Sequence, residues 1–196
     1  MIEPMPAAVT EFEALPTTIA GLLTVRTKHV DDERGRVAEL YRKSALGSVA
    51  SAMRTVGQVN LTTSRLGTIR GLHGEEMTKL VGIVSGRGFG AYLDARPSSP
   101  TFGSVVTMEL GPGTQVLVPS GVCNGFQSLT DGALYLYCFD AEWAPSMPGL
   151  GVNALDPDLA IDWPIRIENT DRSLLSEKDA GLPNFSELGL ARDLLN

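Results

Sequence analysis

The chain has 196 residues, of which 43% are hydrophobic and 20% are charged, and its formal net charge is -7. These values are typical of a globular protein and predict one domain that can bury a hydrophobic core. A sequence-independent nucleic-acid binder needs a basic face against the phosphates, so the acidic balance argues against that class. It leaves a nucleotide ligand open, because a few local arginines can hold a diphosphate.

Targeting and redox signals are weak in this chain. Cys123 and Cys138 are the two cysteines and form no CxxC pair, so we expect reduced thiols in a cytoplasmic protein. The N-terminus is acidic and lacks the basic region and apolar run of a secretion signal. No stretch approaches the roughly 18 uninterrupted apolar residues of a membrane-spanning helix, so we expect no membrane partner.

Short apolar or alternating runs recur along the chain, each closed by Gly- or Pro-rich turns. They cover residues 21–25, 56–63, 80–85, 89–93, 105–110, 115–118 and 134–139. Short strands with this punctuation are typical of a sandwich or barrel, and they are too short and too often broken for βαβ units. The sequence therefore predicts a single all-β domain over residues 1–196, with a core of about residues 20–165.

Two segments are expected to be helical. Residues 38–53 are rich in Leu, Ala, Arg and Ser, although Gly47 weakens the pattern. Residues 186–195 carry four leucines and predict a terminal helix within a helical segment of about residues 170–196. Residues 142–164 are expected to be a loop. The Gly-rich stretch 86–90 opens no helix, so it predicts a hairpin and not a phosphate loop.

Histidine occurs only twice, as His29 and His73. His29 precedes an acidic turn and is expected to be exposed. His73 follows Arg70 and Gly71, and a bulge at Gly71 could bring the Arg70 and His73 side chains together. Two histidines do not supply the converging ligands of a barrel metal site, so no metal is expected. An ordinary hydrogen-bonded histidine remains open, and acid–base catalysis is the better function if His73 is functional.

Three further residue types could carry chemistry, but each has an ordinary structural interpretation. Lys79 begins an apolar run and could be a solvated lysine at a strand start. Tyr135 and Tyr137 would share one face of a strand, as buried core tyrosines also do. Asp179 could be a carboxylate at the start of a helix. The residues alone leave both interpretations open.

Taken together, these segments resemble the dTDP-4-dehydrorhamnose 3,5-epimerase family in collinear matches that cover roughly residues 30–183. In chain order the matching motifs are Asp32-Glu33-Arg34-Gly35, Gln58-Val59-Asn60, Arg70-Gly71-Leu72-His73, Lys79-Leu80-Val81, Ser99-Pro100-Thr101-Phe102-Gly103, Val118-Pro119-Ser120-Gly121 and Leu175-Ser176-Glu177-Lys178-Asp179. Each motif is weak alone, but this many in one order is specific. The resemblance implies a cupin-like jelly-roll barrel that forms a homodimer.

The resemblance also implies an activity. It predicts inversion of C3, C5 or both in a dTDP-4-keto-6-deoxyhexose, through an enolate and without a cofactor, in deoxysugar biosynthesis. His73 would be the base, and Asp179 would fix the tautomer of its imidazole. Lys79 would stabilise the enolate at the C4 oxygen, and Tyr137 would return a proton on the opposite face.

The same resemblance implies a set of residues that bind the nucleotide-linked sugar. They are Arg34, Glu39, Gln58, Asn60, Arg70, Asn124 and Trp143. The planar fork of arginine suits the diphosphate because it donates two hydrogen bonds at once. The aromatic Trp143 could stack on the sugar or the base.

Three features depart from the family pattern. Asn124 replaces a second histidine and cannot shuttle a proton near neutral pH. Glu75 and Glu76 place negative charge in the short loop after His73. Residues 36–38 replace the usual aromatics. These changes predict altered specificity, such as inversion at one carbon only. Two alternatives stay open, namely a non-catalytic sugar-nucleotide-binding cupin and a 3,4-ketoisomerase on the same barrel.

Overall fold

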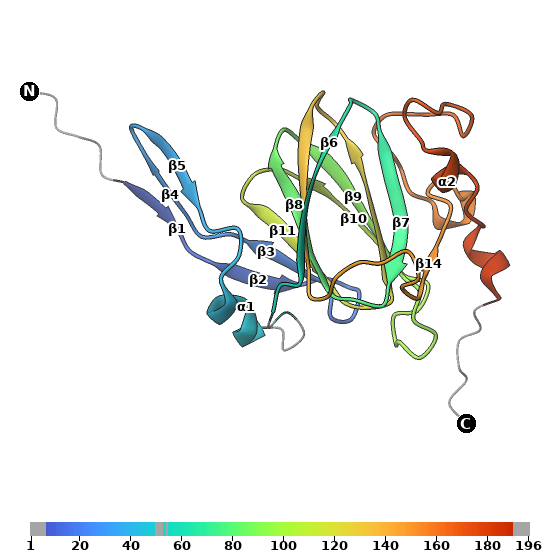
Figure 1. Ribbon diagram of the computed structural model, residues 1–196, viewed down its shortest axis with the longest axis horizontal. Helices are drawn as coiled ribbons and strands as arrows, with labels where there is room; N and C mark the ends of the chain where they lie inside the picture. Colours follow the sequence, from blue (N-terminus) through green and yellow to red (C-terminus); the bar gives the residue numbers. More distant parts are fainter. Residues whose placement is uncertain (1–6, 50–52, 54, 190–196) are drawn as a thin grey trace, which may run out of the picture.

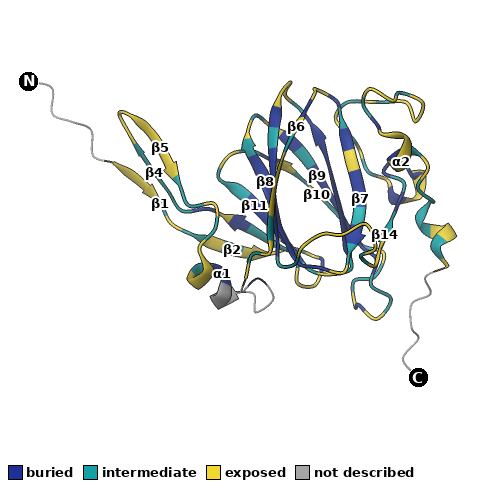
Figure 2. Ribbon diagram, viewed as in Figure 1, coloured by how far each residue is buried: buried dark blue, intermediate teal, exposed yellow. Residues whose placement is uncertain are grey.

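A computed structural model describes residues 7–49, 53 and 55–189 of the chain. The first of its three sheets is an arm with the strand order β1-β4-β5. Its strands are β1 (Ala8–Thr10), β4 (His29–Asp32) and β5 (Gly35–Ala38). Figure 1 shows the arm projecting away from the rest of the protein, and Figure 2 shows that much of its surface is exposed.

The other two sheets are antiparallel and form the body of the protein. The five-stranded sheet has the order β10-β9-β12-β7-β14, with β10 (Val105–Leu110), β9 (Gly88–Asp94), β12 (Val122–Ser128), β7 (Ile69–Glu75) and β14 (Gly149–Gly151). The six-stranded sheet has the order β2-β3-β11-β8-β13-β6, with β2 (Glu13–Pro16), β3 (Leu23–Arg26), β11 (Thr114–Val118), β8 (Lys79–Ser85), β13 (Ala133–Phe139) and β6 (Gln58–Ser64). The predicted all-β jelly-roll barrel is confirmed.

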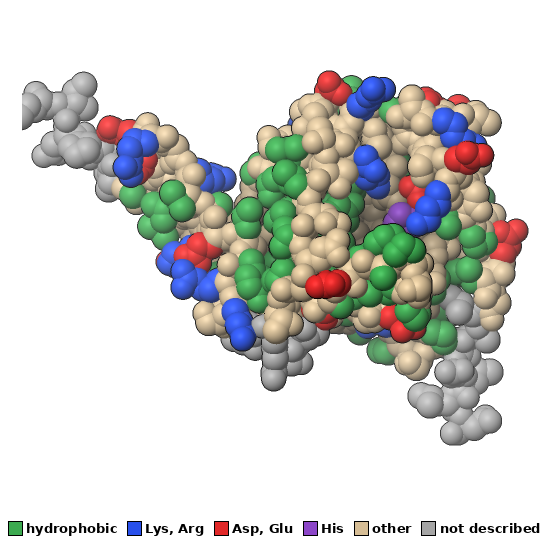
Figure 3. Space-filling view, viewed as in Figure 1, with side chains coloured by type: hydrophobic (Ala, Val, Ile, Leu, Met, Phe, Trp, Pro, Cys, Tyr) green, Lys and Arg blue, Asp and Glu red, His purple; other side chains and the backbone are tan. Residues whose placement is uncertain are grey.

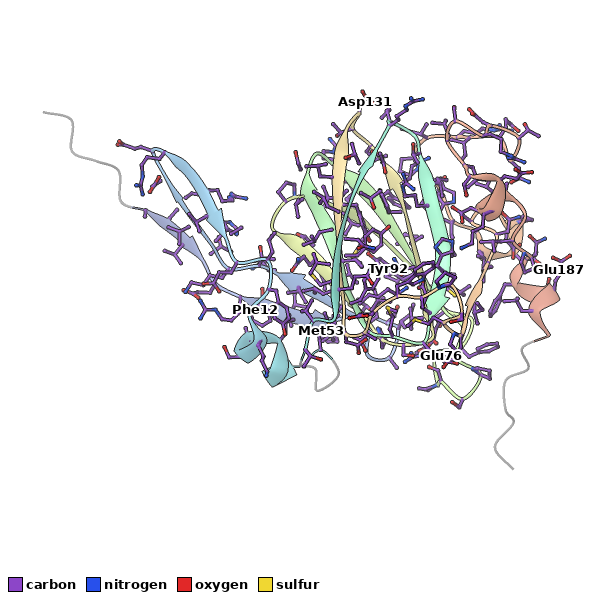
Figure 4. All side chains as sticks on the ribbon, in the orientation of Figure 1. Phe12, Met53, Glu76, Tyr92, Asp131 and Glu187 are labelled. Carbon is purple, nitrogen blue, oxygen red and sulfur yellow. The ribbon has the colours of Figure 1, made fainter. Side chains whose placement is uncertain are left out.

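The interior of the barrel is built from alternate residues of both sheets, because successive side chains of a strand point to opposite faces. Val81 and Tyr135 of the six-stranded sheet share one buried cluster with Tyr92 and Phe126 of the five-stranded sheet. The Phe126 and Tyr135 rings stack with centroids 3.9 Å apart, and such a pair contributes about 1 kcal/mol beyond its buried area. Tyr92 lies between the sheets in Figure 4.

The outer faces of the two sheets are covered differently. The five-stranded sheet packs Leu72 and Leu93 against the C-terminal segment, which contains η1 (Pro157–Leu159), α2 (Glu177–Ala180) and η2 (Phe185–Leu188). The six-stranded sheet is covered in part by Leu46 of α1 (Lys43–Val49). Val59 and Leu61 on the outer side of β6 remain more than half exposed, at 56% and 58%. This sheet therefore presents an incompletely covered apolar face.

The helix predicted over residues 38–53 is confirmed for residues 43–49 and wrong for residues 38–42 and 53. Ala38 ends β5, and the helix begins only at Lys43, while residues 50–52 and 54 lie outside the described residues. The strand wins because β5 pairs with β4 along its whole length, with Ala38 opposite His29. Pairing between distant segments therefore overrides a local helical composition here.

The predicted C-terminal helix and the predicted loop also need correction. Within residues 186–195 the described part is the end of the short η2, which stops at Gly189 in the left-handed conformation, with φ 64°. Residues 190–195 lie outside the description. The expected loop 142–164 contains strand β14 and helix η1, because Gly149 and Gly151 pair with β7.

The stretch 86–90 is not a hairpin, as had been predicted. Strands β8 and β9 on its two sides belong to different sheets, so the turn crosses the barrel from one sheet to the other. The expectation for His29 was also wrong. Its side chain is only 11% exposed, because it lies on strand β4 with Nδ1 3.1 Å from the carbonyl oxygen of Thr27.

A buried ion pair orders the loop that follows β9. The Asp94 carboxylate is fully buried and accepts hydrogen bonds from Arg96 at 2.8 Å and from Ser99 and Thr101 at 2.6 Å. Burial opposes the charged form of Asp94, but these hydrogen bonds outweigh it and lower its pKa to about 2. The carboxylate thus gathers the residues of the Ser-Pro-Thr-Phe-Gly motif around one charge.

We predict that Asp94→Asn lowers the free energy of unfolding by about 2 kcal/mol near neutral pH, because a depressed folded-state pKa is stabilising. This contribution is present above the unfolded pKa and is lost as pH falls from about 4 towards about 2. Denaturant unfolding at a series of pH values measures it. The wild-type stability should fall over that window, and the Asp94→Asn curve should be flatter. The exposed Asp162→Asn serves as control, and an equally flat wild-type curve would contradict the assignment.

Candidate active site

The centre of the candidate site is a hydrogen bond between residues that lie 106 positions apart in the chain. Nε2 of His73 on β7 lies 2.7 Å from Oδ1 of Asp179 on α2. Asp179 is buried, and Ser176 caps α2 by accepting a hydrogen bond from the Asp179 amide at 3.0 Å. Since a carboxylate only accepts, Nε2 carries the proton and Nδ1 carries the lone pair. The predicted contact between His73 and Asp179 is therefore present.

The charge state of Asp179 suits this role. Burial of its carboxyl disfavours the charged form, but the hydrogen bond and the charge of His73 outweigh burial and lower the Asp179 pKa. The carboxylate is thus ionised near neutral pH. An ionised carboxylate at this position can stabilise the imidazolium that forms when His73 takes up a proton.

The bend that presents His73 is made by two glycines in close contact. The pairing of β7 with β12 shifts register between Asn124, opposite His73, and Phe126, opposite Arg70. Gly71 has φ 118°, and a Cβ there would lie only 2.6 Å from Cα of Gly125. The irregularity predicted at Gly71 is therefore present, and it requires glycine at both positions.

Lys79, the first residue of β8, is 2% exposed, so the interpretation as a solvated lysine is wrong. Its Nζ donates to the carbonyl oxygen of His73 at 3.0 Å and forms an ion pair with Glu75. Burial of Glu75 opposes its charged form, but the Lys79 charge and hydrogen bond lower the Glu75 pKa. A buried, charged ammonium thus lies beside the main chain of His73.

Tyr137 faces the interior of the barrel. It lies opposite Val81 on β8 and opposite Asn60 on β6, and its ring centroid is 4.7 Å from that of Tyr135. Burial raises the pKa of the Tyr137 phenol above its ordinary value, while the charge of Arg70 opposes the rise. The phenol is therefore protonated near neutral pH.

Several predicted binding residues surround this interior. Nε of Arg70 donates to Oγ of Ser64 on β6 at 3.1 Å, and Nε2 of Gln58 donates to Oδ1 of Asn60 at 3.0 Å. Gln58 also accepts a hydrogen bond from the Trp143 amide at 2.9 Å. Polar side chains of β6 and β7 thus lie around the opening of the barrel.

A cavity of about 200 Å³ contains the imidazole and extends to the surface. His73, Trp143 and Leu150 line it together with Glu75 and Lys178. Figure 3 shows a histidine in a hollow flanked by basic, acidic and apolar side chains. Lys178 and Glu75 were not predicted as site residues. Lys178 adjoins Asp179 in the chain, and that neighbourhood was the signal available from the sequence.

Asn124 is 5% exposed and lies across the strand pair from His73, on the same face. Its Oδ1 has no hydrogen-bond partner among the described residues. Buried amide oxygens are normally satisfied, so this atom is available to a bound hydroxyl or water. Asn124 therefore lies beside His73 with a buried acceptor that no described residue satisfies.

Two predicted binding residues are not brought to this site within one chain. Arg34 follows strand β4 on the arm, its side chain is 90% exposed, and it pairs with Asp32 on the arm itself. Glu39 follows β5 and pairs with Arg42. Neither residue lines the cavity around His73.

Comparison with protein families decides which family the chain belongs to. Residues 16–187, most of the chain, match the family model described as dTDP-4-dehydrorhamnose 3,5-epimerase. The chain belongs to the dTDP-4-dehydrorhamnose 3,5-epimerase family. It is therefore an enzyme of the isomerase class, and the family predicted from the motifs is confirmed.

Individual members of the dTDP-4-dehydrorhamnose 3,5-epimerase family resemble the chain over most of its length. A dTDP-4-dehydro-6-deoxyglucose 3-epimerase of Streptomyces bikiniensis is 34% identical, covering 87% of this chain and 88% of the relative. The structure of ChmJ, a 3'-monoepimerase of the same species in complex with dTDP-quinovose, covers 90% and 91% of the two chains at 34% identity and TM-score 0.81. The rmlC epimerase of Mycobacterium tuberculosis covers 90% of both chains at 30% identity and TM-score 0.81.

The described part of this family member has short helices and two buried cysteines. No group of three or more His, Cys, Asp or Glu side chains there could hold a metal ion. None of the described helices is long and apolar enough to cross a membrane. Cys123 and Cys138 are both free thiols.

The raised pKa of Tyr137 predicts a spectroscopic result. At about pH 10, where an ordinary tyrosine is half ionised, Tyr137 should contribute no phenolate. Near-ultraviolet titration should therefore give the same phenolate absorbance at that pH for the wild type and Tyr137→Phe. A deficit of about half a phenolate in the variant would contradict the assignment.

Proposed function

We propose that the protein inverts C3, C5 or both in a dTDP-4-keto-6-deoxyhexose by removing and returning a proton through an enolate. The hydrogen bond between His73 and Asp179 carries this proposal, because it orients an imidazole that lines a surface cavity, while Lys79 contacts the main chain of the same histidine. The relatives that act on such sugars at C3, or at C3 and C5, support the substrate class.

The first step is proton removal next to the ketone. Nδ1 of His73 takes the proton from C3 or C5, and the electron pair of the C–H bond moves through C4 to the ketone oxygen. Asp179 stabilises the imidazolium, as a buried carboxylate does behind other catalytic histidines. The ammonium of Lys79 stabilises the negative oxygen of the enolate.

The second step returns a proton to the other face of the carbon. Tyr137 donates its phenolic proton, and the enolate electrons form the new C–H bond. Arg70 lies close enough to lower the Tyr137 pKa against the effect of burial, so its charge favours this donation. The phenolate then takes a proton from water and His73 returns its proton to water, so the net change is inversion alone.

The nucleotide would be held around the opening of the barrel. Arg70 and Lys178 supply positive charge for the diphosphate, and Trp143 is 43% exposed and can stack on a ring. Asn124, with its unpaired Oδ1, can accept a hydrogen bond from a sugar hydroxyl. A histidine can also take or give a proton there and asparagine cannot, so Asn124 bears on which carbon is inverted.

We predict that His73→Ala abolishes deuterium uptake at C3 and C5 when a dTDP-4-keto-6-deoxyhexose is incubated in heavy water. Tyr137→Phe should keep part of the uptake but lose inversion by about 100-fold or more, because the base remains and the acid is missing. Proton NMR of the sugar measures both quantities in one experiment.

The variants should still bind dTDP, which calorimetry checks as a control for folding. Epimerisation by His73→Ala at the wild-type rate would overturn the assignment of the base. Binding of the nucleotide sugar by the wild type with no exchange at either carbon would instead favour a sugar-nucleotide-binding protein.

The exposed arm supports a homodimer in which each subunit completes the site of the other. Arg34 suits a diphosphate but lies on the arm, outside the cavity around His73 of its own chain. Val37 on the arm is 74% exposed and Val9 is 54% exposed, so the arm has apolar surface to bury. A two-fold partner could cover this surface and the open face of the six-stranded sheet together.

Co-expression of Arg34→Ala with His73→Ala tests this arrangement. Each variant alone should lose activity, by at least about tenfold for Arg34→Ala, because a charge partner of the diphosphate is missing. Half of the random dimers would be mixed with one intact site, so about a quarter of the wild-type activity should return. Activity no greater than the sum of the separate variants, or a monomer by light scattering, would contradict the shared site.

The setting of the reaction follows from the same features. We propose that the enzyme works in the cytoplasm, because both thiols are free and a reducing compartment keeps them so. The substrate proposed here carries its own activating ketone. The proposed reaction therefore uses only the side chains of this protein.

A further inference from the structure

We infer that Glu75 is a positioning residue, which together with the His73 carbonyl oxygen holds the ammonium of Lys79 so that one N–H remains for the ketone oxygen of the substrate. The inference rests on the proposed function, because it concerns how the enolate is stabilised. From the sequence, Glu75 was notable only as negative charge close to His73.

Two protein groups hold the ammonium of Lys79. The Lys79 side chain is 2% exposed, so its ammonium is shielded from bulk water. Within the described residues its partners are the Glu75 carboxylate and the carbonyl oxygen of His73. An ammonium has three donors, so two are engaged by the protein and one is left.

Strand β7 carries both His73 and Glu75. His73 and Glu75 are two residues apart on one strand, so both side chains face the cavity that they line together. The same strand therefore places the base, through the His73 side chain, and the cation, through the Glu75 carboxylate and the His73 carbonyl. An enolate needs both at once, with the base at a C–H bond and the cation at the neighbouring oxygen.

The charges of Lys79 and Glu75 compensate each other. A buried ammonium without a partner is expensive, and a carboxylate in direct contact makes its burial tolerable. Burial of Glu75 raises its pKa, but the charge and hydrogen bond of Lys79 more than reverse this, so the Glu75 carboxyl is ionised. The Glu75 side chain is 21% exposed and lines the cavity, so it joins the buried ammonium to the cavity wall.

The neighbouring Glu76 provides a matched control. It is exposed, it follows Glu75 directly, and it does not line the cavity around His73. A substitution of Glu76 removes the same charge from the same turn without touching Lys79. A difference between the two variants therefore reports the contact with Lys79 and not the local net charge.

The experiment is a double-mutant cycle on the rate of deuterium exchange into the sugar. Glu75→Gln should lower kcat about tenfold or more and change KM less than about twofold, because a misplaced group affects the transition state most. Glu76→Gln should leave both within about twofold. In a Lys79→Met background, Glu75→Gln should change the residual rate by less than about twofold, since its effect passes through Lys79.

Several outcomes would overturn the inference. They are a wild-type kcat in Glu75→Gln, the same fold loss in both backgrounds, or an equal loss in Glu76→Gln. If Glu75→Gln fails to fold, Glu75→Asp keeps the charge but withdraws the carboxylate, and it should show the same dependence on Lys79. Absence of exchange in the wild type would instead refute the proposed function, and this inference with it.

Discussion

The hydrogen bond between His73 and Asp179 is the interaction on which the candidate site depends. It joins a barrel strand to a short helix in the segment that covers the outer face of the same sheet. Leu72 packs outward on that segment, while its neighbour His73 faces the cavity. One strand thus secures the covering segment by apolar contact and receives the carboxylate from it. Packing of the covering segment and the geometry of the candidate site are therefore coupled through the adjacent residues Leu72 and His73.

Buried charge is the second constraint. Lys79, Asp94 and Asp179 are all buried, and each is in contact with a basic or acidic partner, namely Glu75, Arg96 and His73. Removing one partner of such a pair is costly, because it leaves a buried charge without compensation. Each pair therefore fixes the positions of both of its groups. In the loop after β9 the pair orders the backbone, and around His73 two pairs set the positions of an imidazole and an ammonium.

The sequence predicted the barrel better than the arm, for a physical reason. Runs such as 105–110 alternate because one face of each strand is buried, and β10 has those bounds. The sequence of β4 is polar and predicts a turn. It forms a strand because it pairs with β1 and β5. The site residues of β7 and β8 came from motifs, whereas the contact of Glu75 with Lys79 depends on how two strands meet. No local pattern encodes that distance.

The separation of His73 and Asp179 in the chain also bears on how the protein is made. Synthesis proceeds from the N-terminus, so every strand of the barrel leaves the ribosome before Asp179 does. An unfinished chain can therefore contain Lys79 and Tyr137 while its imidazole still lacks the carboxylate. The cavity beside His73 is also incomplete at that stage, because Lys178 and Leu182 line it. Synthesis of α2 and of the residues just after it, and not closure of the barrel, therefore completes the candidate site.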